Sequence, residues 1–177
     1  MRLFDYIAQG GPVMYLLLFL NIIGFSLLLW KSFSIYDANK NFHQTVKQLK
    51  DKLNSLINID ETSIAISILK DEVQMTAHKL EKGLNTIKII ASIAPLLGLL
   101  GTVLGILSAF KVISDAGLSN PSLFAGGIAM ALITTVGGLI VAIPHFVGYN
   151  YLVSALDNYE IQLEKDLMKE IYGKKNV

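Results

Sequence analysis

Three long stretches without a charged side chain constrain this chain more than any other feature of its sequence. No Asp, Glu, Lys or Arg lies within residues 12–30 or 89–110, and Asp115 alone interrupts residues 112–156. A helix rises about 1.5 Å per residue, so about 20 apolar residues cross the roughly 30 Å hydrocarbon core of a membrane. Each stretch is therefore long enough to span a membrane as a helix. Their continuous apolar character excludes the alternating pattern of barrel strands.

The composition agrees with a membrane protein. Hydrophobic residues make up 53% of the chain and charged residues only 16%, with a mean hydropathy of +0.52. Soluble domains of this length carry more charge. We therefore predict an all-α membrane protein of one domain, residues 1–177. Its spans are expected at about 12–30, 89–110 and 123–149, and its helical extensions at about 31–88 and 150–177.

The segments outside the spans have apolar side chains at helical spacing, with charged side chains between them. This pattern predicts amphipathic helices over residues 32–57 and 151–172 that continue the first and third spans. Residues 58–60 break the pattern, and Asp60 or Thr62 could cap a further helix that buries Ile64, Ile68 and Val73. At the N-terminus, a short helix at the membrane surface is expected to end at the Gly10-Gly11-Pro12 turn.

The lysines predict the orientation in the membrane. Positive residues near span ends are retained on the cytoplasmic side, and nine of them lie in the loop between spans one and two and four in the tail: Lys31, Lys40, Lys47, Lys50, Lys52, Lys70, Lys79, Lys82 and Lys88, then Lys165, Lys169, Lys174 and Lys175. The N-terminus has only Arg2, and the loop between spans two and three has only Lys111 at its edge. The expected order is N-out and C-in.

Several classes of function are disfavoured by what the sequence contains. There is no cysteine, and the three histidines, His43, His78 and His145, lie in different segments, so no metal site is expected. No phosphate-binding loop or nucleophile–base pair is apparent, so neither an enzyme nor a cofactor is expected. Lysines interleaved with Asp and Glu also argue against binding to nucleic acid.

The second and third spans share an arrangement of threonine between small residues. Steps of three and four residues place side chains on one helix face. One face carries Gly98, Thr102, Gly105 and Ala109, and the matching face carries Ala131, Thr135, Gly138 and Ala142. Thr134 is turned about 100° from Thr135, so we rank it below Thr135 and expect its hydroxyl to bond to the carbonyl of Met130.

Two interpretations of these faces stay open at this point. Small residues let membrane helices pack closely, as Gly101 and Gly105 would in a GxxxG contact. Alternatively, the threonines could line a narrow central space around a partner helix, where a hydroxyl donates and accepts hydrogen bonds without carrying charge. Periodicity does not separate the two. Pro95 and Pro144 are expected to shape their helices where neighbouring helices cover the freed carbonyls.

The segments APLLGLLGTVLGILSAF, GIAMALITTVGGLIVAIP and VGYN resemble the MotA/TolQ/ExbB proton channel family, and the GGPVMYLLLFLNIIGF start of the first span is similar to its ExbB type. The resemblance implies an inner-membrane homopentamer around single-span helices of an ExbD- or TolR-type partner. Such an assembly would use the proton-motive force to work on a TonB- or TolA-type periplasmic protein. It further implies that Thr102 and Thr135, with Thr134 as a lesser candidate, lie along the ion path. Small residues would face the pore and the partner helix: Gly98, Gly105, Ala109, Ala131, Gly138 and Ala142.

The chain departs from the family at Met130, where many ExbB and TolQ proteins place a glutamate. With no carboxylate in any span, the chain would depend on a membrane aspartate of its partner to carry protons. An ExbB-type motor subunit is the main hypothesis, and a TolQ-type subunit of a Tol-Pal system is the alternative within the family. A passive membrane scaffold is the alternative from another class.

Overall fold

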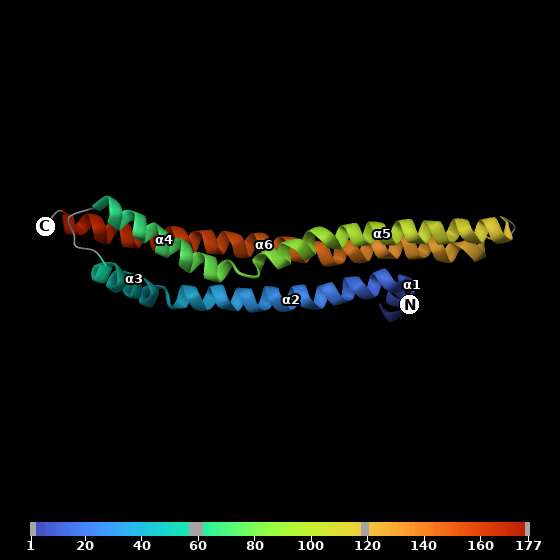
Figure 1. The fold of residues 1–177 in the computed structure, drawn as a ribbon. Coiled ribbons are helices and arrows are strands. Elements are labelled where there is room, and N and C mark those ends of the chain that lie inside the picture. Colours follow the sequence, from blue (N-terminus) through green and yellow to red (C-terminus); the bar gives the residue numbers. More distant parts are fainter. Residues whose placement is uncertain (1–2, 57–61, 118–120, 176–177) are drawn as a thin grey trace. The chain divides into compact units, whose positions relative to one another are not determined.

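The computed structural model describes residues 3–56, 62–117 and 121–175, and every regular element among them is a helix (Figure 1). The helices are α1 (Leu3–Gln9), α2 (Gly11–Lys40), α3 (Phe42–Leu56), α4 (Thr62–Glu81), α5 (Leu84–Ala116) and α6 (Ser122–Lys175). The predicted all-α class is confirmed for this part of the chain.

Within the described residues, three helices are long and apolar enough to cross a membrane. They are Gly11–Lys40, Leu84–Ala116 and the Ser122–Lys169 portion of α6. Each contains one of the predicted spans, which confirms their number; their exact borders in the membrane stay a prediction. The orientation in the membrane stays a prediction.

The chain divides into two compact units, and its assignment to one domain stays a prediction. The first unit comprises Met1–Leu28 and Thr86–Tyr149, and the second comprises Leu29–Asn85 and Asn150–Val177. These borders fall within a few residues of the predicted ends of the spans. The reason is that the apolar segments pack with one another, while the amphipathic segments form a separate core of their own.

The helices are interrupted where the sequence favours a turn. Gly11 has a φ of 65° between α1 and α2, a left-handed conformation that glycine adopts without strain, and Pro12 occupies the first turn of α2. This confirms the predicted turn. The helix expected over residues 32–57 is instead divided at Asn41, whose carbonyl accepts the amides of Gln44 and Thr45 as α3 begins.

The second unit has its own apolar core, which α3, α4 and α6 share: Val46, Leu49, Leu69, Val73, Tyr159, Leu163 and Leu167. Ile68 packs against this core and Val73 belongs to it, as predicted. The prediction for Ile64 and the expected cap at Asp60 or Thr62 fall on residues or side chains outside the described ones, although α4 does begin at Thr62.

Lys31 lies in the second unit with its side chain turned inward. Its side chain is only 4% exposed, and its Nζ donates to the carbonyl oxygen of Leu80 at 3.2 Å. The last carbonyls of a helix lack intrahelical partners, so Lys31 satisfies one of them near the end of α4. The ammonium also lies 4.9 Å from the centre of the Trp30 ring.

We expect Leu163→Ala to lower the thermal stability of the purified chain in detergent, measured as the midpoint of unfolding. Leu163 is 0% exposed in the second unit, and truncating such a residue costs about 2–5 kcal/mol through lost burial and the cavity left behind. Ile161→Ala is the matched control on the same helix, because Ile161 is 62% exposed. Equal effects of the two substitutions would contradict the described core.

Candidate ion-pathway site

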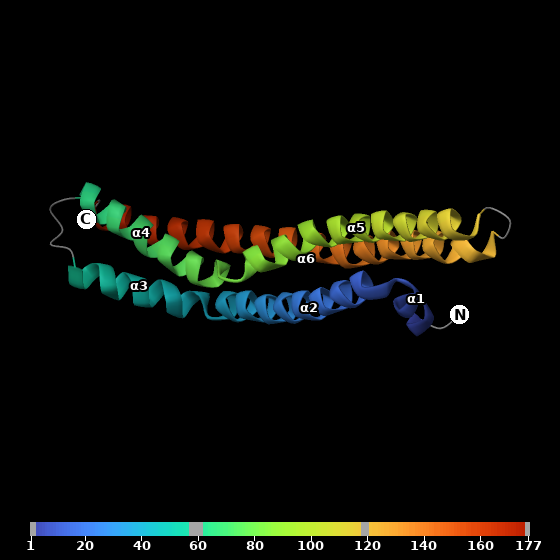
Figure 2. The ribbon, with the colours of Figure 1, turned by 45° about the vertical axis from the view of Figure 1, so that its right-hand side comes forward.

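In the first unit, α5 and α6 lie side by side along their apolar segments and run antiparallel (Figures 1 and 2). A Cβ atom on Gly105 would lie 2.6 Å from the carbonyl oxygen of Gly127, and one on Gly138 would lie 2.6 Å from that of Ala94. Both distances are too short for a real contact, so the two backbones touch where glycine permits it. We call this contact the α5–α6 seam.

The seam changes the role predicted for the small residues. All six are buried within the single chain: Gly98, Gly105, Ala109, Ala131, Gly138 and Ala142. Gly98 lies against Thr135 and Gly138, and Gly105 against Gly127 and Ala131. Their surface within the single chain is therefore occupied by neighbouring helices, and a position facing a pore or a partner helix stays a prediction for these residues.

Thr134 belongs to the same seam. It is 0% exposed, and its Oγ1 lies 3.0 Å from the carbonyl oxygens of both Met130 and Ala131. The predicted bond to Met130 is confirmed. A Cβ on Gly101 would lie 2.4 Å from the Thr134 side chain, so Thr134 fills the space that this glycine leaves. A place along an ion path stays a prediction for Thr134, whose hydroxyl is buried and already bonded within α6.

Thr102 and Thr135 are half-buried and retain free surface in the single chain. The Oγ1 of Thr102 donates to the carbonyl of Leu99, one turn earlier on its own helix. The Oγ1 of Thr135 lies 3.5 Å from the carbonyl oxygen of Gly98, a long contact across the seam. A hydroxyl that donates one hydrogen bond keeps two lone pairs, so both side chains can accept further bonds from a visiting group or water.

The geometry of the helix pair places these two threonines on the same side. Each follows a seam residue by one position, Thr102 after Gly101 and Thr135 after Thr134, and is thus turned from it by about 100°. In two facing antiparallel helices, this rotation carries both residues towards the same edge of the pair. We call this edge the threonine edge.

Helix α2 packs on the other side of α6. Met14 and Leu17 lie against Gly137, which is turned about 200° from Thr135 along α6. Further along, Gly24 lies against His145 and Leu28 against Gly148, so α2 and α6 run parallel. The threonine edge is consequently not covered by α2. We conclude that one chain leaves it open.

The surface around the threonine edge is apolar. Helix positions one or two turns from each threonine carry exposed aliphatic side chains: Leu99 and Ile106 beside Thr102, and Ile128, Leu132 and Leu139 around Thr135. No Asp, Glu, Lys or Arg occurs in residues 89–110 or 122–149. The two hydroxyls are therefore the polar groups on an otherwise aliphatic strip.

Met130 lies on the side of α6 that faces α2. A Cβ on Gly11 would lie 3.5 Å from the Met130 Cε. The thioether thus packs near the turn between α1 and α2. Met130 therefore supplies an apolar contact at this position. Pro95 and Pro144 both lie inside continuous helices, α5 and α6.

Comparison with known proteins identifies the family of this chain. The profile of the MotA/TolQ/ExbB proton channel family matches residues 39–165, well over half of the chain. The chain belongs to this family. The match includes α5, the seam and both edge threonines. With three apolar helices, it is a multi-pass protein of the bacterial inner membrane.

Individual relatives carry names from two branches of the family. The biopolymer transport protein ExbB of Aquifex aeolicus is 45% identical over 91 residues, covering 51% of this chain and 61% of that protein. The biopolymer transport protein exbB1 of Vibrio cholerae is 38% identical over 96 residues, which cover 54% of this chain and 42% of that protein. The Tol-Pal system protein TolQ of Haemophilus influenzae is 37% identical over 104 residues, which cover 55% of this chain and 46% of that protein. The chain spans about half the length of these relatives.

Proposed function

We propose that this chain is the multi-span subunit of a proton-driven motor of the ExbB type. In this proposal, copies of the chain assemble as a pentamer, N-out and C-in, around single-span helices of an ExbD- or TolR-type partner. The motor would act on a TonB-type periplasmic protein. The observation that supports it best is the threonine edge, because Thr102 and Thr135 share one uncovered side of the α5–α6 pair.

The chemistry of the edge suits a transient stop for an acidic side chain. The chain has no Asp or Glu in the three spans, so a membrane aspartate of the partner would carry the proton. While ionised, that carboxylate would accept hydrogen bonds from the hydroxyls of Thr102 and Thr135 or from water held between them. Once protonated, it would lose this charge-assisted attraction and could move along the aliphatic strip.

The energy of one proton suffices for such a step. Moving an elementary charge across the membrane potential releases about 2.3 kcal/mol per 100 mV. That amount can bias movement between near-equivalent subunits, whereas it is too small to unfold a helix. A surface of aliphatic side chains with two hydroxyls per chain allows movement at low cost, since it offers no ion pair that must first be broken.

The experiment is proton flux into liposomes that contain the chain alone or the chain with its single-span partner, under an imposed potential. The proposal expects flux only with the partner, because only the partner supplies a carboxylate in the membrane. A passive scaffold predicts no flux in either case, and that result would overturn the proposal. Flux from the chain alone would contradict the assigned role of the partner.

A TolQ-type role is the second candidate, because TolQ of Haemophilus influenzae is nearly as similar to the chain as the ExbB proteins are. Co-purification with an ExbD-type or with a TolR-type partner distinguishes the two systems. We expect the ExbD-type partner to be retained through detergent extraction. Retention of the TolR-type partner alone would assign the chain to the Tol-Pal branch.

A further inference from the structure

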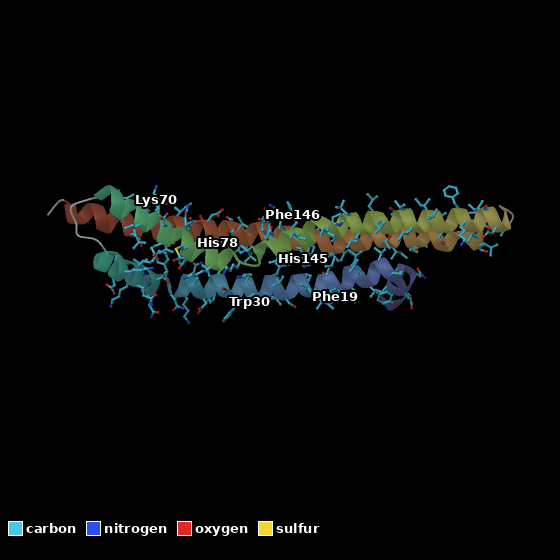
Figure 3. All side chains as sticks on the ribbon, viewed as in Figure 1. Phe19, Trp30, Lys70, His78, His145 and Phe146 are labelled. Atoms are coloured by element: carbon cyan, nitrogen blue, oxygen red, sulfur yellow. The ribbon has the colours of Figure 1, made fainter. Side chains whose placement is uncertain are left out.

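His145 is a buried titratable group that the proposed motor does not use. Its side chain is 0% exposed in the first unit, on the side of α6 that faces α2, while the adjacent Phe146 is 62% exposed (Figure 3). The ring lies edge-on to that of Phe25 in α2, with 4.9 Å between the ring centres and 71° between the planes. Its position after Pro144 in the sequence predicts a residue at the inner membrane surface, with a place in the proton exit as the alternative.

The hydrogen bond of His145 defines the tautomer of its neutral ring. Its Nδ1 lies 2.7 Å from the carbonyl oxygen of Val141, one turn earlier in α6. A carbonyl only accepts, so Nδ1 must carry the hydrogen. In a neutral ring the lone pair is then on Nε2, and Nε2 is buried without a hydrogen-bond partner among the described residues. Such an unpaired buried atom calls for an explanation.

The position of Nε2 depends on Gly24. A Cβ atom on Gly24 would lie 2.0 Å from Nε2 and 2.3 Å from the neighbouring ring carbon. The imidazole therefore occupies the space that a side chain would fill, and α2 lies directly over its unprotonated nitrogen. A proton added to Nε2 would point at the backbone of α2, where the described structure offers no acceptor.

The surroundings contain no anion to compensate a charged imidazole. Residues 11–28 of α2 contain one titratable group, the exposed Tyr15. Residues 122–149 of α6 contain one besides His145 itself, which is Tyr149. On α5, Lys88 is the nearest charged group in register, with its Nζ 5.9 Å from the Tyr149 ring, and it is positive. Lys111 and Asp115 of α5, like Asp5 of α1, are at least 15 residues away in helix register, roughly 20 Å or more.

We propose that Nε2 of His145 is a proton-binding site of this chain, and that a proton bound there opens the contact between α2 and α6. The proton comes from water and adds one N–H bond to the ring, which becomes positive. Because a buried charge without a partner is costly, the protonated ring requires α2 to move away so that water can hydrate it. This site lies ten residues from Thr135 along α6, roughly 15 Å in helix rise, and does not depend on the proposed motor.

The direction of the pH effect follows from proton linkage. The closed state holds a neutral imidazole, and the open state holds a protonated one, so opening takes up one proton. Opening should therefore become more frequent as the pH falls, by up to about tenfold for each pH unit, because it takes up one proton.

Hydrogen exchange and NMR on the full chain in lipid nanodiscs test this proposal together. In a His43→Gln/His78→Gln background, which removes the two exposed histidines, ¹⁵N-labelled His145 should show the Nδ1–H tautomer at about pH 8 and a doubly protonated ring near pH 5. Over the same range, the protection of the α2 amides around Gly24 should fall about tenfold per pH unit, while that of α5 amides at the seam stays constant.

His145→Phe in the same background is the control, because phenylalanine keeps an aromatic ring and cannot titrate. We expect its α2 protection to be independent of pH after correction for intrinsic exchange. If this variant does not fold, the NMR titration of the unmodified His145 still decides. A ring that stays neutral at pH 5 or an Nε2–H tautomer at pH 8 would overturn the proposal, as would protonation without a loss of α2 protection.

Discussion

Gly127→Ala should separate α5 from α6, whereas Gly126→Ala should leave them packed. A Cβ on Gly127 would lie 2.7 Å from the carbonyl oxygen of Gly105 and 2.8 Å from the backbone nitrogen of Ala109, and backbone cannot move aside as a side chain can. Overpacking of this kind typically costs about 1–3 kcal/mol. We expect the upper end of that range, because the contacting atoms are backbone.

The adjacent glycine provides the matched control. Gly126 is exposed and has nothing within 4 Å of an added Cβ. Alanine favours a helix over glycine by about 1 kcal/mol, so Gly126→Ala should be neutral or slightly stabilising. The readout is the thermal unfolding midpoint of each purified variant in detergent, together with its yield of assembled oligomer. Equal behaviour of the two variants would mean that the seam does not form as described.

Thr135→Val should abolish most of the partner-dependent proton flux without preventing assembly. Valine has nearly the shape of threonine and lacks the hydroxyl. A hydrogen bond to a charged group contributes roughly 1.5–3 kcal/mol, so losing it should slow the rate-limiting step by about tenfold or more. The measurement is flux into liposomes that contain the variant and its single-span partner, with co-purification as the check on assembly.

Thr134→Val is the control for this experiment. The Thr134 hydroxyl bonds only to carbonyls of its own helix and is buried, so its loss should leave the flux close to that of the unmodified chain. The opposite result, with Thr134→Val inactive and Thr135→Val active, would contradict the proposal that the ion path follows the threonine edge. Full flux in both variants would return both threonines to a packing role.

The helices could be predicted from the sequence because their signals are local. Uninterrupted apolar stretches marked the three spans, Gly11 and Pro12 marked the first turn, and apolar spacing marked Ile68 and Val73. The division at Asn41 was missed, since the apolar spacing of residues 32–57 continues across it. The separation into two units was missed as well, because a continuous helix such as α6 passes from one unit to the other.

The role of the small residues could not be predicted, since periodicity gives the face of a residue and not what lies opposite. Gly98, Thr102 and Gly105 share a face within the width of one helix stripe. The seam is centred on the glycines, including Gly101, which moves Thr102 from the middle of the stripe to its edge. That shift separates packing residues from candidate ion-path residues, and it depends on how α5 meets α6.

His145 was overlooked for a related reason. A histidine inside an apolar stretch was a visible signal, yet its position after Pro144 suggested the membrane surface. Only the packing shows that it faces Gly24, which lies 121 positions earlier in the sequence. The residues around Gly24 in the sequence do not indicate that this glycine makes room for the His145 ring.

Cross-linking from single cysteines can show whether the threonine edge faces the partner helix. The chain contains no cysteine of its own, so each introduced cysteine is the sole thiol of the chain. Cysteine would replace Thr102, Thr134 or Thr135, and a second cysteine would stand one turn from the membrane aspartate of the partner. If this edge faces the partner helix, we expect disulfides from positions 102 and 135 and none from position 134. Cross-links from position 134 alone, or unreactive cysteines at both 102 and 135 in an assembled complex, would contradict it.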